Sequence, residues 1–115
     1  MGVFEQQKAK GEKLTIVGDG EQRRDFIYVK DIVEANIQVG FQEPLLGSHI
    51  YNVGSGKNYS VNEIAEWIGG ETTNIPPRIE PKETLLDSRD MMEFFNWQPT
   101  MELEKWVKNR QKKKE

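Results

Sequence analysis

Two adjacent arginines, Arg23 and Arg24, stand where a glycine turn leads into a short alternating run of residues. Gly18 and Gly20 allow the chain to reverse tightly just before them. A planar guanidinium at such a junction can hold a phosphate group through two parallel hydrogen bonds. Arginine pairs beside acidic residues are also common as solvated surface groups. Residue type and spacing therefore leave two hypotheses open: a phosphate-binding arginine and a solvated pair.

The other reactive residue types form no catalytic or metal-binding pattern. The chain has no cysteine and one histidine, His49, which we interpret as a structural residue at the start of a strand. The carboxylates show no spaced pair in an apolar setting that would indicate acid–base catalysis. No spacing is typical of metal ligands. The stretch Gly54–Gly56 lacks the third glycine of a dinucleotide-binding loop, so we interpret it as a turn.

The composition indicates a small soluble domain. The 115 residues are 36% hydrophobic and 30% charged, and their formal net charge of −3 gives no reason to expect a nucleic-acid partner. No apolar run approaches the roughly 20 residues of a membrane span, and the N-terminus does not resemble a secretory signal. We therefore expect one domain over residues 1–115, located in the cytoplasm. The basic tail at 110–115 is interpreted as a solvated helix end.

The elements that would position the arginines are short. We predict strands or extended stretches over 14–17, 26–29 and 49–53, and helices over 3–10, 31–40, 61–68, 88–95 and from about 101. Asp31 is predicted to cap its helix, and Ser60 with Glu63 forms a capping-box pattern. Three prolines limit residues 75–86 to a short edge strand. The three tryptophans are interpreted as packing residues. This alternation favours a small mixed α/β domain.

Three stretches follow one another along most of the chain. They read GDGEQRRDFIYVKD at 18–31, YNVGSG at 51–56 continued by SVNEIA at 60–65, and LD at 86–87 followed by NWQP at 96–99 and LE at 103–104. The series resembles the "GDGxQxRDFxYVxD", "YNVGSGxxxSVxEIA" and "LAD…LGWxPxxxLEEG" segments of the extended short-chain dehydrogenase/reductases, specifically the NAD-dependent epimerase/dehydratase family of nucleotide-sugar enzymes. The segments belong to the C-terminal, substrate-binding half of such an enzyme.

Nothing in the chain resembles the cofactor-binding half of that family. None of Tyr28, Tyr51 and Tyr59 has a lysine four residues later, so the family's catalytic Tyr-x-x-x-Lys pair is missing from the sequence. The resemblance implies a small α+β lobe that packs against a Rossmann domain in the complete enzyme. It also implies that the lobe is inactive alone and holds no cofactor, whereas the complete enzyme uses NAD or NADP to oxidise a sugar hydroxyl transiently.

The resemblance further implies a binding site for the nucleotide diphosphate of a UDP-, dTDP-, GDP- or ADP-sugar. It places Arg24 on the pyrophosphate and makes Arg78 a second phosphate-contacting arginine. Thr15 and Val17 fall where family members line the base pocket, and Val17 stands at a position that is often aromatic. The resemblance transfers no catalytic residue to this chain.

Two interpretations of such a lobe stay open. In the first, the chain is a fragment that needs an N-terminal Rossmann half for activity. In the second, it is a free-standing, non-catalytic binding or assembly protein derived from the lobe. In both, the face that relatives bury against the Rossmann domain would be uncovered. We predict that this face forms an apolar patch and promotes self-association.

Overall fold

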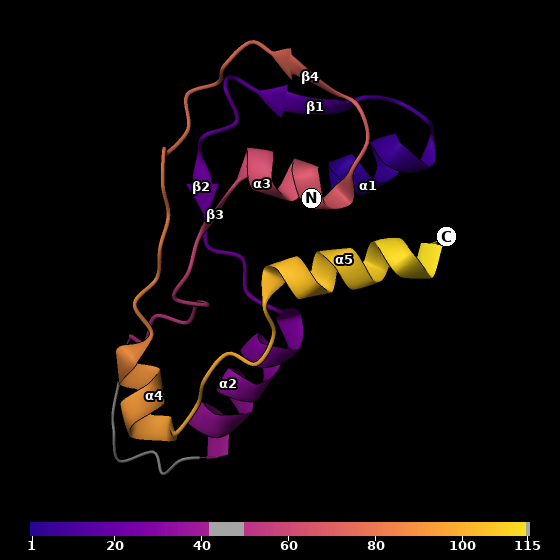
Figure 1. Cartoon of the computed structure of the whole chain (residues 1–115). Coiled ribbons are helices and arrows are strands. Elements are labelled where there is room, and N and C mark those ends of the chain that lie inside the picture. The colour runs from indigo at the N-terminus through magenta and orange to yellow at the C-terminus, as the bar shows by residue number, and fades with distance from the viewer. Residues whose placement is uncertain (42–49, 115) are drawn as a thin grey trace.

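The computed structural model describes residues 1–41 and 50–114 and has the predicted mixed α/β composition (Figure 1). Its elements are α1 (Gly2–Ala9), β1 (Leu14–Val17), β2 (Arg23–Arg24), α2 (Val29–Phe41), β3 (Tyr59–Ser60), α3 (Val61–Ile68), β4 (Thr72–Ile75), α4 (Arg89–Phe95) and α5 (Leu103–Lys114). The radius of gyration, 17.0 Å, exceeds the roughly 13 Å of a compact domain of about 100 residues. The molecule is therefore elongated.

Two small sheets lie near the arginines. β1 pairs in parallel with β4, and β2 pairs antiparallel with β3, so that Arg23 lies opposite Ser60 and Arg24 opposite Tyr59. The prediction of β1 is confirmed, because Leu14 and Ile16 alternate into the core. β4 was not predicted as such, because its exposed residues lack an apolar pattern and its strand form depends on pairing with β1.

Two of the predicted extended stretches are wrong. The strand lies at Arg23–Arg24 rather than at 26–29, because only the two arginines pair with β3 and α2 already begins at Val29. Residues 50–53 form no strand, and His49 lies outside the described residues. The capping box at the start of α3 is confirmed, since the Ser60 hydroxyl accepts a bond from the Glu63 amide while the Glu63 carboxylate accepts one from the Ser60 amide.

The prediction that Asp31 caps a helix is also wrong. α2 begins at Val29, two residues earlier, and Asp31 lies inside its first turn with only 4% of its surface exposed. Its carboxylate instead accepts hydrogen bonds from the Thr100 amide at 2.9 Å and the Thr100 hydroxyl at 2.6 Å. The buried charge is therefore compensated by a distant loop rather than by its own helix.

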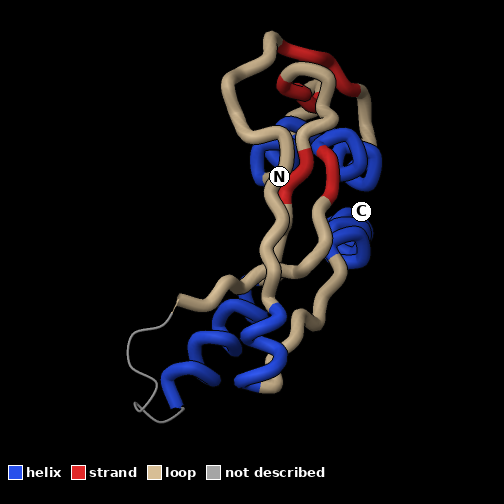
Figure 2. Tube along the Cα trace, turned by 90° about the vertical axis from the view of Figure 1, so that its left-hand side faces the viewer, coloured by secondary structure: helices blue, strands red, loops and turns tan. Residues whose placement is uncertain are grey.

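The buried apolar residues form two clusters. The first contains Phe4, Leu14, Ile16, Ile64, Ala65, Ile68, Leu103 and Val107, and the second contains Ala35, Met91, Phe95 and Trp97. The first cluster lies among α1, β1, α3 and α5, and the second lies between α2 and α4 at the other end of the molecule (Figure 2). The single-domain assignment stays a prediction.

The packing role predicted for the tryptophans is confirmed. Trp97 is buried in the second cluster and donates its indole N–H to the Asp31 carbonyl at 2.9 Å. Trp67 and Trp106 pack against the first cluster. Trp67 also meets the Tyr59 ring edge-on at 5.2 Å. These rings are used within the fold, so none of the three is a free stacking surface.

Candidate functional site

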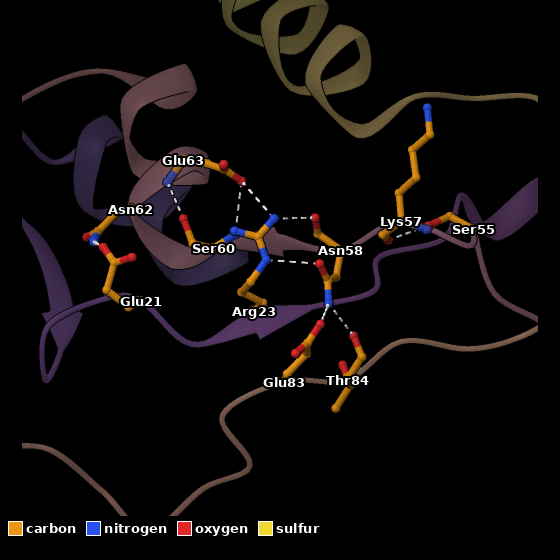
Figure 3. Close-up of polar contacts among 10 residues, drawn as sticks. All are labelled: Glu21, Arg23, Ser55, Lys57, Asn58, Ser60, Asn62, Glu63, Glu83 and Thr84. Atoms are coloured by element: carbon orange, nitrogen blue, oxygen red, sulfur yellow. Dashed lines mark hydrogen bonds and ion pairs between the residues drawn. The ribbon is translucent and has the colours of Figure 1, made fainter.

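The first arginine of β2, Arg23, is part of an internal polar network. Its Nε donates to the Asn58 side-chain oxygen and its Nη2 donates to the Asn58 carbonyl, each at 2.9 Å. Nη2 also lies 3.8 Å from the carboxylate of Glu63, the capping residue of α3. Figure 3 shows Arg23 between Asn58 and Glu63, with Asn58 in turn bonded to Glu83 and Thr84. Arg23 therefore joins three segments and has a structural role.

The second arginine, Arg24, is less fully engaged. Its Nη1 donates to the Arg23 carbonyl at 2.8 Å, and its Nη2 lies 3.8 Å from the carboxylate of Glu80. A quarter of its side chain is exposed. A guanidinium has five N–H donors in a fixed fork. Among the described residues its guanidinium donates one hydrogen bond, so the fork retains donors for an external anion.

The loop 76–86 lies along β2 and contains a further arginine, Arg78. The Arg23 amide donates to the Lys82 carbonyl at 2.8 Å, and the Thr84 amide donates to the Arg23 carbonyl at 3.0 Å. Further up the loop, Pro77 lies so close to Gly18 that a Cβ on Gly18 would be 3.3 Å from the Pro77 Cβ. Arg78 follows at once and is exposed. It forms no recorded hydrogen bond or ion pair with the described residues.

Asp25, directly after Arg24, fixes the loop at Gly54–Gly56. Its carboxylate accepts hydrogen bonds from the Ser55 amide at 2.9 Å, the Gly56 amide at 3.2 Å and the Leu86 amide at 3.2 Å, and from the Ser55 hydroxyl. A Cβ on Gly54 would lie 2.6 Å from the Leu86 Cβ. The loop amides are thus occupied by a carboxylate of the chain itself. This arrangement does not fit the pyrophosphate of a dinucleotide cofactor.

Thr15 and Val17 lie on the face of β1 opposite its buried residues and are half-buried. The Thr15 hydroxyl accepts a hydrogen bond from the Gln7 side chain at 2.9 Å, and its amide donates to the same side chain at 3.0 Å. The Val17 carbonyl accepts one from Gln22 at 3.1 Å. The structure brings Val17 close to the turn before Arg24, whereas the polar groups of Thr15 bond to α1. No recorded bond within the described residues joins either one to Arg24.

The ring of Tyr59, the partner of Arg24 across the β2–β3 pair, stands in an acidic surrounding. Burial raises the pKa of its hydroxyl above 10.0, and the nearby carboxylates of Glu102 and Glu104 raise the pKa further.

The described residues include no cluster of histidine and carboxylate side chains that could hold a metal ion. Within the same part of the chain, no helix is long and apolar enough to cross a membrane.

Sequence reasoning missed the partners of both arginines. Asn58 and Glu80 lie 35 and 56 residues after the arginines that they contact, in loops with no periodic pattern. A single sequence holds no signal for such pairings. The one local hint is the capping box, because it fixes Glu63 at the start of α3 and thereby next to the strand that Ser60 ends.

Comparisons with known proteins agree with this architecture. The sequence model of the NAD dependent epimerase/dehydratase family matches residues 3–54. UDP-glucose 4-epimerase of Mycolicibacterium smegmatis is 31% identical over 110 residues, which cover 90% of this chain and 34% of the relative. UDP-glucuronate 4-epimerase of Thermodesulfobacterium geofontis is 36% identical over 104 residues, which cover 83% and 31%. The chain thus spans about a third of the length of these relatives.

Solved structures share the fold. The crystal structure of UDP-glucose 4-epimerase with UDP-glucose from Thermotoga maritima is 29% identical and aligns with a TM-score of 0.81 over 96% of this chain and 37% of that one. UDP-N-acetylglucosamine 4-epimerase from Methanobrevibacter ruminantium, in complex with UDP-N-acetylmuramic acid, is 29% identical with a TM-score of 0.82 over the same shares, 96% and 37%. By its sequence and its fold, the chain matches part of the enzymes of the NAD-dependent epimerase/dehydratase family.

Proposed function

We propose that the chain is the C-terminal, substrate-binding lobe of a nucleotide-sugar epimerase or dehydratase and that Arg24 binds the diphosphate. The observation that supports this most directly is the contrast within β2. Within the described part of the chain, Arg23 is held by Asn58 and Glu63, whereas the Arg24 guanidinium bonds only to a backbone carbonyl and lies near one loose carboxylate. The fork of Arg24 therefore retains donors for the two-point contact that a phosphate accepts.

The relatives support a ligand of this class. The solved epimerases of Thermotoga maritima and Methanobrevibacter ruminantium contain UDP-glucose and UDP-N-acetylmuramic acid. Both ligands are UDP derivatives, and UDP has two phosphate groups. In this chain Arg78, which is exposed on the loop beside β2, contacts the second phosphate. The half-buried face of β1 with Thr15 and Val17 forms one side of the base pocket.

In this proposal, residues outside this lobe carry out the redox chemistry of the complete enzyme. NAD supplies a hydride acceptor in the family, and the loop at Gly54–Gly56 does not fit it, because Asp25 occupies the amides of Ser55 and Gly56. The contribution of this lobe is to hold and orient the nucleotide end of the substrate. An N-terminal Rossmann half is the partner that would supply the cofactor.

Calorimetric titration of the 115-residue chain with UDP tests the proposal. We expect Arg24→Gln to weaken binding about tenfold, because one charge-assisted contact in a partly exposed site is lost. Arg89→Gln is the matched control, since it removes the same charge from an exposed residue that pairs with its neighbour Asp87. Equal affinities for wild type and Arg24→Gln would refute the role of Arg24.

A further inference from the structure

The loop that contains Arg78 also places an acidic side chain on Arg24. The Glu80 carboxylate lies 3.8 Å from Nη2 of Arg24, and the two side chains are 34% and 25% exposed. Within the described residues this is the only recorded interaction of Glu80. Among the described residues, the acidic partner of Arg24 is therefore a carboxylate at the place where the proposed function puts a phosphate.

The geometry of this pair is loose. A separation of 3.8 Å is too long for a hydrogen bond, whereas the exposed pair of Arg89 and Asp87 closes to 2.7 Å. The backbone near Glu80 is nonetheless held on both sides, by Pro77 against Gly18 and by the Lys82 carbonyl, which accepts a bond from Arg23. The backbone at residue 80 therefore stays near Arg24 when the Glu80 side chain rotates away from the guanidinium.

An anion that binds Arg24 must exchange with Glu80. Replacing one carboxylate by one phosphate group changes the charge balance at Arg24 little, so the exchange itself adds little affinity. A ligand with a second phosphate group can gain from a second cation. Among the described residues Arg78 is suited to this, because it lies two residues from Glu80 on the same loop and has no recorded partner.

Building on the proposed function, we propose that Glu80 lowers the affinity of this site for phosphate ligands by competing with them for Arg24. In the free chain it neutralises the guanidinium, and it leaves when a diphosphate binds. Glu80 thereby weakens the binding of every phosphate ligand, and a compound with one phosphate group is held too weakly to fill the site. A second phosphate group restores the lost affinity by contacting Arg78.

Titration of the full chain with inorganic pyrophosphate tests the competition. Glu80→Gln keeps the size of the side chain and removes its charge, so we expect pyrophosphate to bind about threefold to fivefold more tightly. Glu83→Gln is the matched control: it removes the same charge from the same loop, but Glu83 bonds to Asn58 rather than to Arg24. Glu80→Asp retains the charge on a shorter side chain and should give an intermediate affinity.

A double-mutant cycle separates competition from bulk charge. In the Arg24→Gln background, Glu80→Gln should no longer improve binding, because the group for which it competes is gone. An unchanged or weaker affinity for Glu80→Gln, an equal gain for Glu83→Gln, or a gain that persists without Arg24 would each overturn the inference. If Arg24→Gln alone leaves binding unchanged, the proposed function fails first. If Arg24→Gln weakens binding while Glu80→Gln has no effect, only the competition fails.

Discussion

Arg23 and Arg24 differ in what surrounds their guanidinium groups, although they are neighbours of the same type. Successive residues of a strand point to opposite sides, so Arg23 reaches Asn58 and Glu63 while Arg24 reaches Glu80 on the adjacent loop. Residue type and spacing allow a phosphate-binding arginine at this turn, and the family resemblance selects Arg24. The sequence could not show that Arg23 is already bonded, because its partners lie in distant loops.

This difference predicts opposite phenotypes for the two substitutions. Arg23→Gln should lower the free energy of unfolding by about 1–2 kcal/mol, since it breaks bonds to Asn58 that are only partly screened by solvent. Arg24→Gln should leave the free energy of unfolding nearly unchanged, because the hydrogen bond that the Arg24 guanidinium donates within the described residues goes to the neighbouring carbonyl of Arg23. Urea denaturation followed by circular dichroism measures both. A larger loss of stability for Arg24→Gln would contradict the structural role of Arg23.

At the scale of the elements, local patterns predicted helices better than strands. The Ser60–Glu63 pattern marks the start of α3 because both halves of the capping box lie within four residues. β2 and β4 are fixed by pairing with β3 and β1, which no local pattern records. Asp31 shows the same limit, since its position before an apolar run predicts a cap, yet a loop 69 residues away supplies its partner.

The turn that leads into β2 depends on the missing side chain of Gly20. Gly20 has a φ of 74°, and a Cβ there would overlap the Asn62 amide oxygen and lie 2.7 Å from a methyl group of Ile16. We expect Gly20→Ala to destabilise the chain by about 2–4 kcal/mol through both backbone strain and overlap. Gly56→Ala is the control: its φ is 78°, but nothing lies within 4 Å of its Cβ.

Thermal unfolding of the two alanine variants measures the difference. Gly56→Ala should cost about 1–2 kcal/mol, the strain alone. Equal losses for the two variants would show that the close approach of Asn62 to Gly20 is unimportant. A greater loss at Gly20 would confirm that this turn, and with it the position of β2, requires glycine for space as well as for conformation.

At the scale of the whole molecule, α2 leaves an apolar row uncovered. Val29, Val33, Ile37 and Phe41 recur every fourth residue and are all exposed, so they lie along one side of the helix. Exposed apolar rows of this kind are typical of surfaces that bind another protein. This row is a candidate for the apolar face expected from the sequence, and both that assignment and the self-association stay predictions.

Sedimentation at increasing concentration tests that prediction. We expect the weight-average mass to rise with concentration, because contact between copies removes the α2 row from water. The double substitution Val33→Gln/Ile37→Gln should reduce the rise. Val3→Gln, at an exposed apolar residue of α1, should not. A constant monomer mass across the concentration range would show that the α2 row does not drive the association of two copies.

Because the two apolar clusters are separate, tryptophan fluorescence can follow each of them. Trp97 belongs to the cluster between α2 and α4, whereas Trp67 and Trp106 pack against the other one. Indole emission from a variant that retains only Trp97 therefore follows one end of the chain, and emission from a variant without Trp97 follows the opposite end. Comparing the two signals during melting reveals whether both halves come apart as a single cooperative unit or in succession.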